Sequence, residues 1–300
     1  MKNDRKATII LLISYVAFGT TAVTKHFVTA PTGFVSMSRA FGGAISLFLV
    51  TLLLKRRISF SAIRKNAFIL ILSGISLAVN WVVLFTVYRL AGTAMATILD
   101  YLAPVIVFFL SPVLFKEKIT VWKVLIALAA VLGVVMVSGA FSGAIMANGG
   151  GFMTGILLGI VCAITYALFI ICNKKARDIS PFDKGIAQMA VCGTVIIPYV
   201  LITEIPAVAS YAWTPGNVAL FLFFIFIQTG IAYGCYFYSI GAVPAQKSSI
   251  LSFIDPVVTL SIAFLFLHES MDWIQAAGAV LILAGAFFLE FRFPKKQKAA

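Results

Sequence analysis

The chain has little charge and few of the residues that carry enzyme chemistry. Charged residues make up 11% of its 300 residues, and it has 10 acidic residues, 2 histidines and 4 cysteines. A soluble domain is usually about one quarter charged. The cysteines show no CxxC spacing, which argues against a zinc motif or a disulfide framework. The glycines form neither a GxGxxG nor a GxxxxGK[ST] loop, so nucleotide coupling is not indicated. We expect neither a cofactor nor a metal.

What is abundant is apolar sequence. Hydrophobic residues reach 62% and the mean hydropathy is +1.07. A stretch of roughly 20 apolar residues crosses a bilayer core, and the sequence contains ten such stretches. We expect an all-α integral membrane protein with ten transmembrane helices, at residues 7–28, 32–54, 68–89, 93–115, 120–140, 151–172, 183–205, 217–239, 243–267 and 271–291.

Basic residues predict how these spans are oriented. The net charge is +13, but the positive residues lie in short loops between apolar spans, which does not indicate a nucleic-acid partner. With the N-terminus inside, all but three of the 23 Lys and Arg residues fall on one side, the exceptions being Lys25, Arg39 and Arg89. The positive-inside rule therefore predicts a multi-pass protein of the cytoplasmic membrane with both termini in the cytoplasm.

One stretch of the sequence is written twice. Residues 98–117 read ILDYLAPVIVFFLSPVLFKE, and residues 250–269 read ILSFIDPVVTLSIAFLFLHE, at a constant offset of 152. The chain therefore divides into a first repeat at residues 1–140, an extracytoplasmic linker at 141–150 and a second repeat at 151–300. Five spans per repeat is an odd number, so the second repeat must enter the membrane upside down. Inverted-topology repeats are typical of secondary transporters.

Two charged residues in the first repeat lie at the same expected depth. Arg39 and Asp100 each stand about 10 Å inside spans that begin at the outer side. An intramembrane arginine is costly and needs a partner. We therefore predict an Arg39–Asp100 ion pair, which either braces the helices statically or opens as a gate during transport.

Polar and aromatic side chains near the middle of several spans are candidates for substrate binding. Asn80 and Trp81 stand near the midplane, where an amide can donate and accept and a ring can face a cation; helix packing is an equally good explanation. Gln228 and Tyr233 fall in the middle third of a later span, and Tyr166 is placed to face a central cavity.

Asp255 is the strongest single functional candidate. It stands roughly 18 Å from the cytoplasmic end of its span, close to the bilayer centre. It also breaks the repeat, because Ala103 occupies the equivalent position. Its carboxyl either pairs with Lys247 or Arg39, or binds a substrate or a coupling proton; Lys247 and Arg39 are thus candidate coupling residues as well.

Prolines recur at equivalent positions of the duplicated stretch. Pro104 and Pro256 each stand inside a span, where proline removes a backbone hydrogen bond. Their matched positions predict a helix hinge or a cavity wall.

With ten spans, two inverted halves and a Pro-Val pair followed by Glu117 or Glu269 in each half, the chain resembles the drug/metabolite transporter superfamily, in its EamA-type ten-helix branch. The resemblance implies a carrier with alternating access, whose cavity-lining aromatics would be Trp81, Tyr101, Tyr166 and Tyr233. Many members carry Trp-Gly in the first helix, where this chain has Phe18-Gly19.

The function expected from these observations is secondary transport of a small polar metabolite, such as an amino acid, in the direction of export. Uptake of an organic cation is the alternative, because a carboxylate with aromatic faces suits one. An integral-membrane enzyme is less favoured, since the sequence has no catalytic cluster, and we expect no enzymatic activity. The partners expected are a small-molecule substrate, the lipid bilayer and a coupling proton, and a monomer is sufficient.

Overall fold

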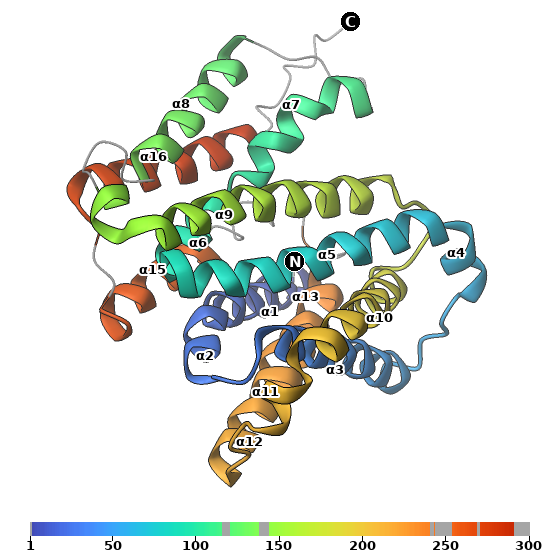
Figure 1. The fold of residues 1–300 in the computed structure, drawn as a ribbon. Helices are drawn as coiled ribbons and strands as arrows, with labels where there is room; N and C mark the ends of the chain where they lie inside the picture. Colours follow the sequence, from blue (N-terminus) through green and yellow to red (C-terminus); the bar gives the residue numbers. More distant parts are fainter. Residues whose placement is uncertain are drawn as a thin grey trace, which may run out of the picture.

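The computed structural model describes residues 2–115, 121–137, 144–240, 243, 254–268 and 271–290. These residues form helices and no strand (Figure 1), which confirms the all-α expectation. In chain order the helices are α1 (Lys2–Gly19), α2 (Thr21–Phe27), α3 (Thr32–Leu53), α4 (Phe60–Lys65), α5 (Ala67–Ala91), α6 (Thr93–Asp100), α7 (Ala103–Phe115), α8 (Val121–Val137), α9 (Ala144–Lys175), α10 (Pro181–Tyr199), η1 (Val200–Glu204), α11 (Ile205–Ala209), α12 (Pro215–Leu222), η2 (Phe223–Ile231), α13 (Ala232–Ile240), α15 (Ile254–Phe266) and α16 (Trp273–Glu290).

Within the part of the chain that the structure describes, six helical segments are long and apolar enough to cross a membrane: Arg5–Phe27, Thr32–Leu53, Ala67–Ala91, Gly150–Lys175, Pro181–Ala209 and Pro215–Ser239. Shorter apolar helices occupy parts of the other expected spans, among them Ile254–Phe266 and Trp273–Gly285. Large apolar side chains cover the surface; Leu53 is 81% exposed and Ile202 80% exposed. A contiguous apolar surface of this kind suits lipid. The protein is therefore a multi-pass membrane protein.

Local sequence signals explain several helix starts. Ser180 precedes Pro181, and its side chain accepts a hydrogen bond from the Asp183 amide at 3.1 Å. Thr214 precedes Pro215 in the same way and accepts from the amide of Asn217. A Ser or Thr cap followed by proline in the first turn is a strong helix start, because proline lacks the N–H that would be unpaired there.

Several of the expected spans are broken or distorted. The first expected span is split into α1 and α2 at Thr20, and the fourth into α6 and α7 at Tyr101 and Leu102. The segments η1 and η2 are π-helical, a wider winding that is frequently found at functional sites. Residues 144–150 of the predicted linker at 141–150 are helical and belong to α9, and the division into repeats stays a prediction.

The predicted hinge Pro104 lies at a helix start and not in a helix interior, because it is the second residue of α7. Pro256 lies in α15, which is described from Ile254 onward. Proline in the first turn of a helix removes no hydrogen bond, because that N–H has no intrahelical partner. The break that precedes α7 is thus compatible with Pro104, while a hinge function of either proline stays a prediction.

Helices α8 and α16 are the last described helices of the two expected repeats, at Val121–Val137 and Trp273–Glu290. Helices α8 and α16 also pack closely against each other, and a Cβ added to Gly133 would stand 2.6 Å from the Gly278 carbonyl. Figure 1 shows this pair at one edge of the molecule.

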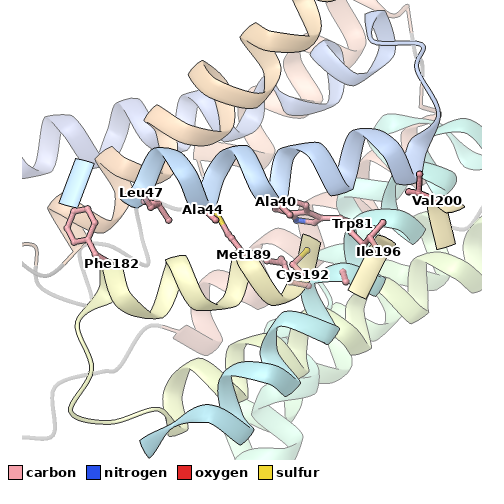
Figure 2. Close-up of a cluster of buried hydrophobic side chains, with 11 residues drawn as sticks. Ala40, Ala44, Leu47, Trp81, Phe182, Met189, Cys192, Ile196 and Val200 are labelled. Atoms are coloured by element: carbon pink, nitrogen blue, oxygen red, sulfur yellow. The ribbon is translucent and has the colours of Figure 1, made fainter. Parts of the chain in front are cut away.

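Helices α3, α5 and α10 enclose the largest buried cluster. Figure 2 shows α3 and α10 side by side, with Ala40, Ala44 and Leu47 of α3 facing Met189 and Cys192 of α10. The helices approach closely through glycine: a Cβ on Gly74 of α5 would stand 2.6 Å from Val191 Cβ and 2.9 Å from the Gln188 carbonyl oxygen. Small residues at helix contacts are the usual way to pack membrane helices, because lipid gives no hydrophobic drive for their association.

The substitution Gly74→Ala should therefore destabilise the protein by about 1–3 kcal/mol, because the added methyl group is forced against the α10 backbone. Unfolding of the purified protein in mixed micelles by SDS titration measures this change. Ile75→Val, at a neighbouring position that is 39% exposed, is the control and should change stability by less than about 0.5 kcal/mol. Equal stability of both variants would show that α5 and α10 are not in close contact.

Candidate functional site

Five of the predicted site residues lie on helices that pack together, or in the turn between two of them, and form what we call the central polar cluster, namely Asp100, Tyr101, Tyr166, Tyr233 and Asp255. Helix α6, which ends with Asp100, packs against α9, which carries Tyr166, and against α15, which carries Asp255. Helix α1 packs against both α15 and α13, which carries Tyr233. All five residues are half-buried, so they keep accessible surface. They come from both predicted halves of the chain.

Asn80 joins three helices at this cluster. Its side-chain amide nitrogen donates to Asp100 Oδ1 at 3.0 Å and to the Cys162 carbonyl oxygen at 3.1 Å. The residue is only 3% exposed. Both amide hydrogens are therefore used within the protein, and Asn80 fixes the Asp100 carboxylate relative to α5 and α9. Sequence analysis selected Asn80 as a substrate contact, and the structure shows it in a supporting position.

Asp255 lies where α15 touches the break between α1 and α2. The hydroxyl of Thr259 is 3.0 Å from the Gly19 carbonyl oxygen and 3.1 Å from the Asp255 carbonyl oxygen. A Cβ added to Gly19 would stand 2.7 Å from that same Asp255 oxygen. Glycine is thus required at position 19 because the backbone of α15 approaches so closely. The Phe18-Gly19 pair keeps this glycine, and the Phe18 ring packs in a tilted arrangement on Tyr233 of the cluster, with 4.7 Å between the ring centres.

The Arg39 side chain is held by aromatic rings and one hydroxyl. The guanidinium carbon lies 4.4 Å from the ring centre of Phe224, 4.6 Å from that of Trp81 and 5.4 Å from that of Phe85. Arg39 Nε donates to Thr229 Oγ1 at 2.8 Å. Aromatic faces stabilise a cation electrostatically, most strongly where water is excluded, and Arg39 is 4% exposed.

The predicted Arg39–Asp100 ion pair is not formed. Across the described residues the one ion pair within 4.0 Å joins Lys65 and Asp178. Equal depth fixes the height of two residues along their helices but not the direction in which their side chains point. Arg39 points into the aromatic rings around it, and Asp100 instead accepts a hydrogen bond from Asn80. Asp100 therefore belongs with Asp255.

Trp81 and Gln228 are more deeply buried than the rest of the candidate set. Trp81, 6% exposed, belongs to the cluster of Figure 2 and faces Arg39. Gln228 Nε2 donates to Thr20 Oγ1 at 2.6 Å and to the Ala17 carbonyl oxygen at 3.2 Å, which ties η2 to the α1–α2 break. Its Oε1 is buried and has no hydrogen-bond partner. Lys247, the remaining candidate, lies outside the described residues.

Sequence reasoning missed several residues at the site. Tyr88 lies on α5 about two turns after Asn80, and Tyr15 meets Tyr236 edge to face, with 6.0 Å between the ring centres. Thr259 was also missed, although it stands one helical turn after Asp255, a spacing that could have shown that it shares the same face. Tyrosines near span ends resemble interfacial belt residues, which explains why Tyr88 gave no signal.

Apolar helices that surround polar side chains from both halves of a chain are the construction of a membrane transport protein. The chain matches the EamA-like transporter family over residues 5–139 and again over residues 153–291. It belongs to the EamA-like transporter family, and the resemblance to the drug/metabolite transporter superfamily is thereby confirmed.

Individual relatives agree with this assignment. "Uncharacterized transporter YxxF" of Bacillus subtilis is 25% identical over 289 residues, covering 95% of this chain and 89% of that protein. A "Probable amino-acid metabolite efflux pump" of Salmonella typhimurium is 28% identical over 182 residues, covering 58% of this chain and 59% of that protein. A crystal structure with TM-score 0.66 and 17% identity covers 94% of this chain and 96% of its own, which shows a shared fold. Relatives named as transporters agree with a protein that is not an enzyme.

The environment of Arg39 can be tested by a double-mutant cycle. Arg39→Lys removes the planar guanidinium and its bond to Thr229, and should lower the free energy of unfolding by about 1–2 kcal/mol. Because no ion pair joins Arg39 to Asp100, the loss should be the same in an Asp100→Asn background, with a coupling energy below about 0.5 kcal/mol. SDS titration of the four proteins gives the coupling, and a value above about 1 kcal/mol would restore the ion pair.

Proposed function

We propose that the protein is a secondary transporter that exports a small polar metabolite bearing an ammonium group, such as an amino acid, across the cytoplasmic membrane. The observation that carries the proposal is the pair of carboxylates, Asp100 and Asp255, on the adjoining helices α6 and α15. Neither has a cationic side chain within 4.0 Å among the described residues. Two half-buried carboxylates without a counter-charge within membrane helices are costly, and a substrate ammonium group would supply the missing charge.

The surroundings of the two carboxylates suit such a ligand. Tyr101, Tyr166 and Tyr233 offer ring faces and hydroxyls to a cation with a polar or aromatic side chain. Asn80 holds Asp100 in place, so the acceptor is oriented before a ligand arrives. Export is the direction supported by the "efflux pump" in the name of the Salmonella typhimurium relative.

In this proposal the chain works by alternating access of two inverted five-helix repeats. The family matches at residues 5–139 and 153–291 support a duplicated construction. The ten spans expected from the sequence then place both termini in the cytoplasm, and the polar cluster lies between the repeats, where such transporters bind their substrates. One chain contains every residue of the cluster, so a monomer is sufficient.

A second candidate is uptake of an organic cation. The specific observation in its favour is that the central polar cluster holds two carboxylates, whereas the Arg39 guanidinium, which could meet a substrate carboxylate, is covered by aromatic rings. A third assignment uses the same central polar cluster but gives Asp255 the role of carrying the coupling proton.

Counterflow of a labelled amino-acid mixture into proteoliposomes at two external pH values tests the function. Wild-type protein should accumulate label, and Asp255→Asn should reduce exchange at least about tenfold at both pH values, because a hydrogen bond to a charged group is worth about 1.5–3 kcal/mol. Asp178→Asn is the matched control, since Asp178 is exposed, pairs with Lys65 and is not part of the cluster.

The other outcomes are equally informative. Retained exchange that has lost its pH dependence in Asp255→Asn would assign this carboxyl to the proton. Absence of uptake by folded wild-type protein would exclude amino acids, and accumulation of labelled quaternary ammonium compounds in the same vesicles would then establish the organic-cation assignment.

The proposed topology predicts which loops reach each side of the membrane. Ser210→Cys, in the exposed turn after α11, should react with a membrane-impermeant maleimide in intact cells, and Ser61→Cys, exposed on α4, should react only after permeabilisation. The four natural cysteines give the background, which is low because three of them are buried. Labelling of Ser61→Cys in intact cells would reverse the orientation, and labelling of both would contradict the predicted number of spans between them.

A further inference from the structure

A second polar site lies at one end of the helices, at the opposite end of α3 from Lys55. Here the structure contains a cavity of about 860 Å³, lined by side chains of α2, the α2–α3 connection, the end of α5, and the segment from α10 to α11. Small-molecule sites usually measure roughly 300–1,000 Å³. Its polar lining includes Lys25, Tyr88, Arg89, Tyr199, Glu204 and Tyr211. We call it the basic cavity.

The cavity holds two cations that have no acidic side chain within 4.0 Å among the described residues, Lys25 and Arg89. Lys25 Nζ donates to the Val28 carbonyl oxygen at 2.9 Å and to that of Ala30 at 3.5 Å. These bonds fix the ammonium group at the cavity wall. Arg89 is exposed at the last turn of α5, and the two charges interact with each other.

The acidic residue of the lining, Glu204, is already engaged. Its Oε1 accepts a hydrogen bond from the Gly33 amide at 2.9 Å, and its Oε2 accepts one from the Phe34 amide at 2.7 Å. These amides belong to the N-terminus of α3, where the helix dipole stabilises a negative charge. Both Glu204 oxygens are thus held by the amides of α3, and two cations, Lys25 and Arg89, stand against one engaged carboxylate in the cavity lining.

Helix α5 connects the basic cavity with the central polar cluster. Tyr88 of α5 lines the cavity, and Asn80, about two turns earlier on the same helix, donates a hydrogen bond to Asp100 of the cluster. One helix thus runs from the acidic cluster to the basic cavity. This arrangement suits a ligand that carries charges of both signs.

We propose that the basic cavity binds the carboxylate of the transported metabolite, through the guanidinium of Arg89 and the ammonium group of Lys25. Arginine presents a planar pair of donors that matches a carboxylate. The inference rests on the proposed function and extends it, because it makes the substrate a zwitterion with a separate site for each charge. The two sites are used in succession, the cluster for the ammonium group and the cavity for the carboxylate.

Two half-ligands separate the two sites. 4-Methylpentanoate is leucine without its amine, and 3-methylbutylamine is leucine without its carboxylate. Binding of each probe to the full chain, purified in neutral phosphatidylcholine nanodiscs, is followed by the shift of the thermal unfolding midpoint with probe concentration. Arg89→Gln should weaken 4-methylpentanoate binding at least about tenfold, the loss of one charged hydrogen bond, and Arg89→Lys should weaken it less.

The controls make each result specific. Arg89 is the residue to change, because its substitution breaks no hydrogen bond to the described part of the chain. Lys25, by contrast, supports the loop after α2 through its bonds to the Val28 and Ala30 carbonyl oxygens. Arg64→Gln removes an exposed charge from α4, outside the cavity lining, and should leave binding of both probes unchanged. Asp255→Asn should leave 4-methylpentanoate binding unchanged and abolish that of 3-methylbutylamine.

Equal binding of 4-methylpentanoate by wild type and Arg89→Gln would overturn the inference, as would the absence of any binding to wild type. Displacement of the probe by phosphatidylglycerol added to the nanodiscs would assign the cavity to a lipid headgroup and overturn it too. If Asp255→Asn binds 3-methylbutylamine as well as wild type does, while the 4-methylpentanoate results are as expected, the proposed role of the carboxylates is contradicted. The assignment of the basic cavity would then still stand.

Discussion

The arrangement of this protein depends on a constraint imposed by lipid: a polar group inside the helices must find its partner within the protein, because no water is available to it. Each deeply placed polar side chain meets this constraint by joining helices that are distant in sequence. Asn80 joins α5 to α6 and α9, Gln228 joins η2 to the end of α1, and Thr259 joins α15 to Gly19. The polar contacts are thus also the contacts that set helix positions.

The same constraint explains which side chains are free to act. Arg39 and Glu204 are charged and buried, but each is fully engaged, by aromatic rings and Thr229 in one case and by the amides of α3 in the other. Asp100 and Asp255 are engaged only by uncharged donors. These two half-buried carboxylates have no cationic partner within 4.0 Å among the described residues, which makes them candidates to bind a charged ligand.

Much of the helix layout could be predicted from the sequence, because apolar length and the duplicated stretch report it directly. Asp255 was identified from its depth and from Ala103 at the equivalent position. The partner of Asp100 was not, because a depth along a helix says nothing about rotation around it. Glu204 escaped notice for a related reason: it ends the π-helical η1, and helical periodicity does not indicate which way a side chain points after such a distortion. Gly19 is visible in the sequence, but the reason for a glycine at this position is not. The reason is the close approach of the Asp255 carbonyl oxygen, which lies 236 positions further along the chain.

The winding of η2 also has a geometric consequence for the aromatic side chains that follow it. An α-helix turns by about 100° per residue, so a change of one residue in the register of η2 would swing α13 around its axis by that angle. Tyr233 would leave Phe18, and Tyr236 would leave Tyr15. The nine residues of η2 therefore determine the rotation of α13 about its axis. The length of this π-helical segment decides which tyrosines face the two carboxylates.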